Sequence, residues 1–312
     1  MATLSIWRQQ LSEHIAALNK LDSFGRLSYL NANPLENFAY TEQINNWDEF
    51  LLWLNELKGS WRFRGQQESS WSLETSLDRA VRVEHSSGYY HLDRETEQRE
   101  LLYRFQQEAH NHIHPLPSTD DIASWYALMQ HYGAPTRLLD WTKSPYVALY
   151  FAFVDEPQNK AEQYSAVWAI NLDWLAKKET ELLEMEAPTS ALSNSKDRAI
   201  YMNTLLTHSE KRKPLIVQID PQRISQRMVA QQGLFLCKLV HEVYFDHLLV
   251  HMMLNSDLSD QPVLRKLKLE RNMRIAFLRR LREMNIHSAS LYPGLDGFGK
   301  SLKLDLEIKA KS

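Results

Sequence analysis

The sequence predicts an α+β fold in which a mixed or antiparallel sheet packs against several helices. The chain has 312 residues, 44% of them hydrophobic, so it is long enough to bury a proper core. Short runs of β-branched and aromatic residues at 165–170 and 215–220 are typical of buried strands. Helical patterns lie between them without the regular alternation of a doubly wound fold, which favours α+β over α/β.

The N-terminal part begins with two amphipathic helices. Leucine and isoleucine recur at helical spacing in residues 4–21, which we assign to an N-terminal helical segment, 1–42. A second helix follows Asn46, which forms a capping-box pattern with Glu49, and ends at Gly59. The segment 43–302 is then expected to form the main domain, followed by a short tail at 303–312.

Two further helices are expected before the middle of the chain. Residues 94–113 have helical spacing, and residues 121–132 have it again, with a start signal at Ser118 and Asp121. The second of these helices brings His131 to its C-terminal end. His110 and His114 have the i, i+4 spacing of some metal ligands, but a proline follows at once, and we predict no metal site.

The C-terminal half mixes strands and helices. We expect a helical insertion at about 180–213, a turn and strand at 228–239, a strand at 263–269, a helix at 272–284 and tight turns from 291 to 302.

The densest group of polar and aromatic residues lies between Met129 and Phe153. Gly133 and Pro135 end one helix, and Ser144 with Pro145 forms an N-cap followed by a proline in the first helical position. The side chains between these signals are His131, Thr136, Arg137, Asp140, Trp141, Thr142 and Lys143. This density indicates a functional site. The alternative is structural: Asp140 pairs with Arg137 and caps the next helix.

An arginine lies at the end of a short strand expected in the segment SWRFRGQQ at 60–67, where the strand runs into Gly65. Trp61 and Phe63 share one face of that strand, so Arg64 projects from the other. Its planar fork of donors suits a carboxylate or phosphate, and Gly65 would let a ligand approach the backbone. The structural alternative pairs Arg64 with Glu68 or Glu74.

Composition excludes several classes of protein. The formal net charge is −3, so nucleic acid is not an indicated partner, although a nucleotide or other anionic ligand fits the site. No apolar run is long enough to predict a membrane span or signal peptide. The one cysteine, Cys237, has apolar neighbours and fits a buried thiol in a reducing, cytoplasmic setting. The common sequence motifs of nucleotide-binding loops, zinc proteases and esterases do not occur. The sequence does not indicate an oligomeric state.

Four ordered motifs resemble those of the FRG domain, a family of bacterial and phage proteins. They are FRGQ at 63–66, QHYGAPTRLLDWTKSPYVALYFA at 130–152, AQQGLF at 230–235 and LYPGLDG at 291–297. The resemblance covers roughly residues 43–302 and departs from the family at Gly294, where many members carry a polar residue. It implies little about activity beyond a link of some members to phage defence.

The order of the motifs is also similar to that of ADP-ribosyltransferases, with NAD as the substrate. This similarity implies that Arg64 binds the pyrophosphate, that Thr142 and Ser144 hold the nicotinamide side, and that Trp141 or Tyr132 stacks on a ring. The late glutamate of that superfamily is absent, because Gln231 and Gln232 stand in its place. Asp140, Glu242 or Asp296 would have to supply the carboxylate.

The sequence thus predicts one concave site shared by Arg64, His131, Arg137, Asp140 and Thr142. The catalytic candidates are Asp140, Thr142 and His131, and the ligand-binding candidates are Arg64, Gly65, Gln66, Arg137, Trp141, Ser144 and Gln232. No cofactor is firmly indicated beyond NAD as a substrate. The alternative function is a non-catalytic sensor, in which Arg64, His131 and Arg137 bind a nucleic acid or a phage component.

Overall fold

A computed structural model of the protein describes residues 4–21, 29–30, 34–85, 88–91, 93–156, 159, 161–183, 195–207, 213–221, 225–254, 256 and 261–310. The strands are β1 (Tyr40–Ile44), β2 (Trp61–Gln66), β3 (Arg82–His85), β4 (Gly88–His91), β5 (Leu138–Thr142), β6 (Tyr164–Asn171), β7 (Ile216–Ile219), β8 (Gly233–Lys238) and β9 (Leu264–Glu270). The helices are α1 (Leu4–Leu18), α3 (Trp47–Glu56), α4 (Ser76–Ala80), α5 (Arg94–Ala109), α6 (Ile122–His131), α7 (Pro145–Phe153), α8 (Leu172–Leu183), α9 (Ser195–Thr207), α10 (Gln226–Ala230), α11 (Phe245–Leu254), α12 (Arg274–Glu283), α13 (Ser288–Leu291) and α14 (Leu295–Ala310), with short 3-10 turns η1 (Leu35–Asn37) and η4 (Arg271–Met273).

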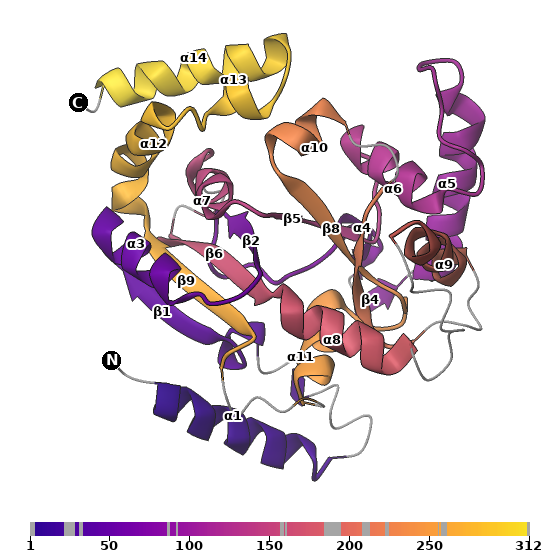
Figure 1. The fold of residues 1–312 in the computed structure, drawn as a ribbon, viewed down its shortest axis with the longest axis horizontal. Helices are drawn as coiled ribbons and strands as arrows, with labels where there is room; N and C mark the ends of the chain where they lie inside the picture. The colour runs from indigo at the N-terminus through magenta and orange to yellow at the C-terminus, as the bar shows by residue number, and fades with distance from the viewer. Residues whose placement is uncertain are drawn as a thin grey trace.

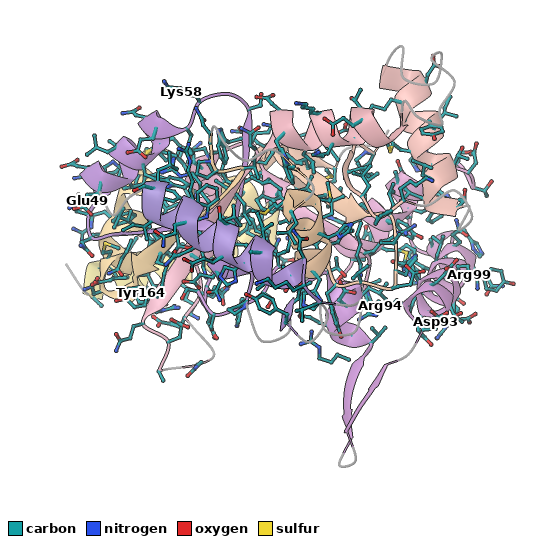
Figure 2. The ribbon with its side chains drawn as sticks, turned by 90° about the horizontal axis from the view of Figure 1, so that it is seen from below. Glu49, Lys58, Asp93, Arg94, Arg99 and Tyr164 are labelled. Carbon is teal, nitrogen blue, oxygen red and sulfur yellow. The ribbon has the colours of Figure 1, made fainter. Side chains whose placement is uncertain are left out.

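A seven-stranded mixed sheet forms the centre of the molecule (Figure 1). The strand order is β1-β9-β6-β2-β5-β8-β7; β1 pairs with β9 in parallel, and every other pair is antiparallel. Strands β3 and β4 form a separate hairpin that projects from the body (Figure 2). The α+β prediction with a mixed sheet is therefore confirmed.

Helices cover both faces of the sheet. In β6, Trp168 and Ile170 join one buried cluster while Val167 and Ala169 join the other, because alternate strand residues point to opposite faces. The first cluster includes residues of α1, α6, α9 and α11, and the second includes residues of α3, α7 and α12. The sheet therefore lies between two helical layers, which explains why strands such as β6 are apolar throughout.

Local signals predicted several helix starts correctly. The Asn46 side chain accepts a hydrogen bond from the Glu49 amide, and the Ser144 side chain accepts one from the Val147 amide at the start of α7. The start of α6 differs from the prediction, because Asp121 alone is the N-cap and accepts from the Ser124 amide. The strands expected near 165–170, 215–220 and 263–269, the helix at 272–284 and buried Cys237 are also present.

Other sequence expectations were wrong or incomplete. Strands β1 and β5 were not expected. Of the turns expected at 291–302, the one at 292–294 is present, but Leu291 ends α13 and residues 295–302 belong to α14. Gly297 lies within α14, where an added Cβ would stand 1.9 Å from the Tyr292 carbonyl oxygen, so this glycine permits close helix contact. The helix expected at 94–113 stops at Ala109, so His110 and His114 do not share a helical face.

The expected domain limits fall inside elements of the fold. Strand β1 crosses residue 42 and α14 crosses residue 302. Within the expected insertion, α8 reaches Leu183 and α9 spans Ser195–Thr207; residues 184–194 and 208–212 lie outside the described residues. None of the helices in the described ranges has both the length and the apolar character required to cross a bilayer.

Candidate functional site

A pocket of about 560 Å³ opens where β2, β5 and β8 meet α6, α7 and α10. Its polar lining includes Arg64, His131, Asp140, Thr142, Arg227 and Tyr292. In Figure 1, α10 lies above β5 and β8 while α13 and α14 lie beside it, which brings the C-terminal helices to the pocket. The pocket therefore combines segments from the middle and the end of the chain.

Arg64 and Asp140 meet at the adjacent strands β2 and β5. The Arg64 Nη1 atom donates a hydrogen bond of 2.7 Å to the Asp140 carbonyl oxygen, while the buried Arg64 Nε has no partner. Burial lowers the pKa of Arg64, and the nearby Asp140 charge offsets part of this effect. Among the described residues, Arg64 forms no ion pair with a carboxylate, so its fork retains unused donors.

The structural alternatives for these two residues are not observed. Glu68 accepts a hydrogen bond from the Asn159 amide, and Glu74 pairs with Arg82 instead of Arg64. The Asp140 side chain is exposed, and no described group donates a hydrogen bond to its carboxylate. It neither caps α7, which Ser144 caps, nor pairs with an arginine. The Asp140 carboxylate is thus available in the pocket.

A second cationic group faces the pocket from α10. The Arg227 guanidinium lies over the Tyr292 ring, 4.6 Å from its centroid, and has no acidic partner among the described residues. His131, at the end of α6, is exposed in the same pocket. Burial of its ring and the charge of Arg227 lower the pKa of His131, which keeps the imidazole neutral at pH 7. Neither Arg227 nor Tyr292 was identified from the sequence.

Thr142 and Ser144 hold the backbone around the pocket. The Thr142 hydroxyl donates to the Gln231 carbonyl oxygen at 2.7 Å and accepts from the Ser144 amide at 3.0 Å. Ser144 is buried at the start of α7 and does not line the pocket. Both hydroxyls therefore have structural partners, and Thr142 contributes to the pocket chiefly by fixing the end of β5.

Gly65 and Gln66 also have structural contacts. A Cβ added to Gly65 would stand 1.9 Å from the Ala148 carbonyl oxygen, so this glycine lets α7 approach β2 and does not serve only a ligand. The buried Gln66 side chain donates to the Ser72 carbonyl oxygen at 3.0 Å and accepts from Trp168 Nε1 at 2.6 Å. Both residues line the pocket, but their polar groups are engaged by the protein.

Arg137 does not reach the pocket. Its side chain is fully buried, donates to the Leu206 carbonyl oxygen at 2.7 Å and lies 2.9 Å from His241 Nε2. Of the five residues predicted to share one site, the pocket therefore contains Arg64, His131, Asp140 and Thr142. Arg137 lies in the core, where its contacts support the fold. The reason is that it directly precedes β5, where its side chain packs against α9 and the segment after β8.

Trp141 and Gln232 differ in position. Trp141 lines the pocket but is 2% exposed and belongs to the core, and its Nε1 has no hydrogen-bond partner. Gln232 is exposed with a φ of 48° and does not line the pocket. Its neighbour Gln231 lines the pocket, and donates from Nε2 to the Leu291 carbonyl oxygen at 3.1 Å.

Of the three expected carboxylates, Asp140 lines the pocket and Glu242 and Asp296 do not.

Two other pocket residues were also missed. Asp155, just after α7, supplies a second carboxylate, and its Oδ2 accepts from Gln67 Nε2 at 3.0 Å. Trp71 is 38% exposed and supplies an accessible aromatic surface. Of these missed residues, only Tyr292 could have been found from the sequence, because it lies in the LYPGLDG motif.

Within the described part of the chain, no cluster of three or more His, Cys, Asp or Glu side chains is arranged to hold a metal ion.

Comparison with known proteins identified one family. The sequence profile of the FRG domain matches residues 59–161, which include the motifs at 63–66 and 130–152 but not the two later motifs. Neither curated proteins nor solved structures gave a match, so the similarity to ADP-ribosyltransferases stays a prediction. The matched segment supplies most of the pocket lining, and Arg227 and Tyr292 come from outside it. The chain therefore contains an FRG domain, to which Arg64, His131, Asp140 and Thr142 of the pocket belong.

Proposed function

We propose that the pocket binds NAD and cleaves the bond between nicotinamide and ribose, passing ADP-ribose to an acceptor or to water. The observation that carries this proposal is the pairing of two incompletely satisfied groups in one pocket. Arg64 has free donor positions and no carboxylate partner, and the Asp140 carboxylate is exposed beside it. An anion-binding arginine next to a free carboxylate suits a substrate with a phosphate at one point and a developing positive charge at another.

Binding would use both polar and apolar groups of the pocket. Arg64 would hold a phosphate with two parallel charge-assisted hydrogen bonds, for which its planar guanidinium is suited. The exposed ring of Trp71, with Pro115 and Pro117 nearby in the lining, offers an apolar surface for a base. A ligand with an aromatic ring and phosphates fits this division of the pocket.

Cleavage breaks the glycosidic bond, and its electron pair leaves with neutral nicotinamide. The ribose carbon then carries positive charge, which the Asp140 carboxylate stabilises by electrostatic attraction. An oxygen of water or of an acceptor forms the new bond to that carbon, and its proton passes to Asp140 or to solvent. His131, neutral at pH 7, is a second candidate to receive this proton.

The sensor function is the weaker alternative. It relies on Arg64, His131 and Arg137 as one anion-binding cluster and requires no carboxylate. Arg137 is buried among backbone carbonyl groups, whereas a carboxylate that a pure anion sensor would avoid lines the pocket. Both observations favour a reacting site.

The test is to incubate the purified protein with NAD and a cell extract and measure free nicotinamide by chromatography and added mass by mass spectrometry. We expect nicotinamide release by the wild type and a loss of about 100-fold or more in Asp140→Asn, the scale of one removed electrostatic group. The matched control is Asp296→Asn, an exposed aspartate outside the pocket lining, which should react like the wild type. Absence of nicotinamide release, or equal rates in wild type and Asp140→Asn, contradicts the proposal.

The family resemblance extends this proposal to a cytoplasmic role in phage defence. The buried thiol of Cys237 is compatible with a reducing compartment. Plaque counts on bacteria that express the wild type or Asp140→Asn test this role. Equal protection by the two proteins would show that defence does not depend on NAD cleavage.

A further inference from the structure

Arg227 is a second cationic group in the pocket, and it lies outside the FRG segment. It lies on α10, outside residues 59–161, and lines the same pocket as Arg64. Its guanidinium stacks over the Tyr292 ring at 4.6 Å from the centroid. Burial raises the pKa of Tyr292, and the charge of Arg227 and a hydrogen bond from its side chain oppose this shift. A guanidinium has five N–H donors, so this contact leaves others available to a ligand.

Tyr292 is held firmly enough to position that guanidinium. The residue follows α13, and its backbone amide donates to the Ser288 carbonyl oxygen at 2.9 Å. Gly297 brings α14 close to Tyr292, and Gln231, just after α10, donates to the Leu291 carbonyl oxygen at 3.1 Å. These contacts join α10 to α13 and fix the cation relative to the pocket.

The electrostatics of the pocket leave room for an anion with more than one charge. Arg64 and Arg227 have no ion pair with a carboxylate among the described residues. Burial is the main cause of the lowered pKa of His131, and the charge of Arg227 contributes, which is consistent with both residues lining one pocket. Two cations that share one cavity repel each other, and a bound dianion would remove this cost.

We propose that Arg64 and Arg227 form a two-sided clamp for a pyrophosphate, with Tyr292 as the positioning residue for Arg227. The inference rests on the proposed function and deepens it, because it assigns the second phosphate contact of the pyrophosphate-containing substrate to Arg227 and predicts a preference for such substrates over mononucleotides. The FRG segment then supplies Arg64 and the reacting carboxylate, while the segment outside the match supplies the second phosphate contact.

The test is calorimetric titration of the full chain with ADP-ribose, which carries a pyrophosphate, and with AMP, which carries one phosphate. We expect wild type to prefer ADP-ribose, and Arg227→Gln to weaken ADP-ribose binding by about 10- to 100-fold, the scale of a lost hydrogen bond to a charged group. AMP affinity should fall much less. Arg280→Gln is the matched control, because Arg280 also lies over an aromatic ring, 5.5 Å from the Trp47 centroid, but outside the pocket lining.

Tyr292 variants separate positioning from general damage. Tyr292→Phe keeps the ring but loses the hydroxyl that interacts with Arg227, so it should weaken ADP-ribose binding less than Tyr292→Leu, which should weaken it about as much as Arg227→Gln. No ADP-ribose binding by wild type, or an unchanged preference over AMP in Arg227→Gln, overturns the clamp. The binding measurements do not depend on turnover. ADP-ribose binding without nicotinamide release would contradict the proposed function and leave the clamp standing. Nicotinamide release with an unaltered KM for NAD in Arg227→Gln would support the proposed function and contradict the clamp.

Discussion

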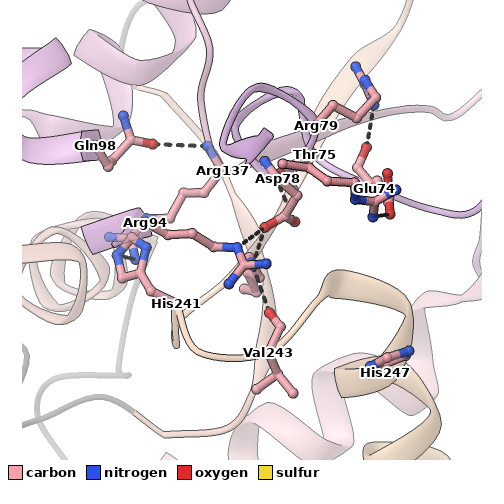
Figure 3. A network of polar contacts seen from close by, with 12 residues as sticks. Glu74, Thr75, Asp78, Arg79, Arg94, Gln98, Arg137, His241, Val243 and His247 are labelled. Carbon is pink, nitrogen blue, oxygen red and sulfur yellow. Dashed lines mark hydrogen bonds and ion pairs between the residues drawn. The ribbon is translucent and has the colours of Figure 1, made fainter. Parts of the chain in front are cut away.

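Two charged regions of this molecule differ in whether their charges are compensated. Around Asp78, the Lys238 Nζ and Arg94 Nε atoms lie 2.7 and 2.9 Å from the same carboxylate oxygen, and Thr75 donates to the other oxygen at 2.9 Å. Figure 3 shows Arg94 reaching Asp78 from α5. In the pocket, by contrast, Arg64 and Arg227 have no carboxylate partner among the described residues, and Asp140 has no donor.

The difference separates structural charges from charges available to a ligand. Asp78 and Lys238 are fully buried, and Lys238 also donates to the Val243 carbonyl oxygen at 2.7 Å. Burial lowers the pKa of Lys238, while Asp78 opposes this shift, so each charge depends on its partner. The Asp140 carboxylate in the pocket is exposed, and among the described residues neither Arg64 nor Arg227 forms an ion pair with a carboxylate. Substitutions in the first region should therefore cost stability, and substitutions in the second should cost binding.

The largest effect on stability is expected for Asp78→Asn. It leaves Lys238 and Arg94 in a buried site without a compensating charge, which should lower the free energy of unfolding by about 3–5 kcal/mol. Urea unfolding at pH 7 measures this change. Asp140→Asn is the matched control and should change it by less than about 0.5 kcal/mol. Equal losses in the two variants would remove the distinction between the regions.

Gly65→Ala should also reduce stability although the residue lines the pocket. The added Cβ would stand 1.9 Å from the Ala148 carbonyl oxygen and 2.6 Å from the Ala152 amide nitrogen, so α7 must move away from β2. We expect a loss of about 1–3 kcal/mol or more in unfolding free energy, as for overpacked cores. Gly299→Ala, where an added Cβ meets nothing within 4 Å, is the control in a helix. A fully stable Gly65→Ala protein would show that the glycine serves the ligand alone.

The electrostatic contact between the two walls predicts a smaller effect on His131. Because burial and Arg227 lower the folded-state pKa of His131 below 6.5, its contribution to stability is present above pH 6.5 and is lost as the pH falls through the lowered value. Arg227→Gln should raise the pKa of His131 towards 6.5 and make this pH dependence shallower. NMR titration of the imidazole signals measures the shift. An unchanged pKa of His131 in Arg227→Gln would show that the charge of Arg227 does not act on this imidazole.

Sequence patterns predicted the parts of the fold that depend on local chemistry. The caps at Asn46 and Ser144 follow from side chains that bond to amides three residues away. Strand β1 was missed because its residues, YTEQI, lack an apolar alternation, and its pairing partner β9 lies more than two hundred residues later. Tertiary contact, not propensity, makes this segment a strand.

The same limit applies to the site. Arg64 was identified from an aromatic strand pattern, His131 from a helix end and Asp140 from its dense polar motif, and the fold brings the three residues into one pocket. Arg137 has the same residue type and lies in the same motif, yet nothing local indicates that Leu206 and His241 surround it. Arg227 was missed for the converse reason, because its role depends on Tyr292, 65 positions further along the chain.

The central claim is that the positive charges of the pocket bind an anionic ligand. Calorimetric titration of ADP-ribose into the wild type and Arg64→Lys tests it most directly. The lysine keeps the charge but loses the planar fork, so we expect affinity to fall by about 1–3 kcal/mol with an unchanged free energy of unfolding. Saturable binding by wild type with this loss supports the claim. Equal affinity in the two proteins, or no binding by wild type, would contradict it.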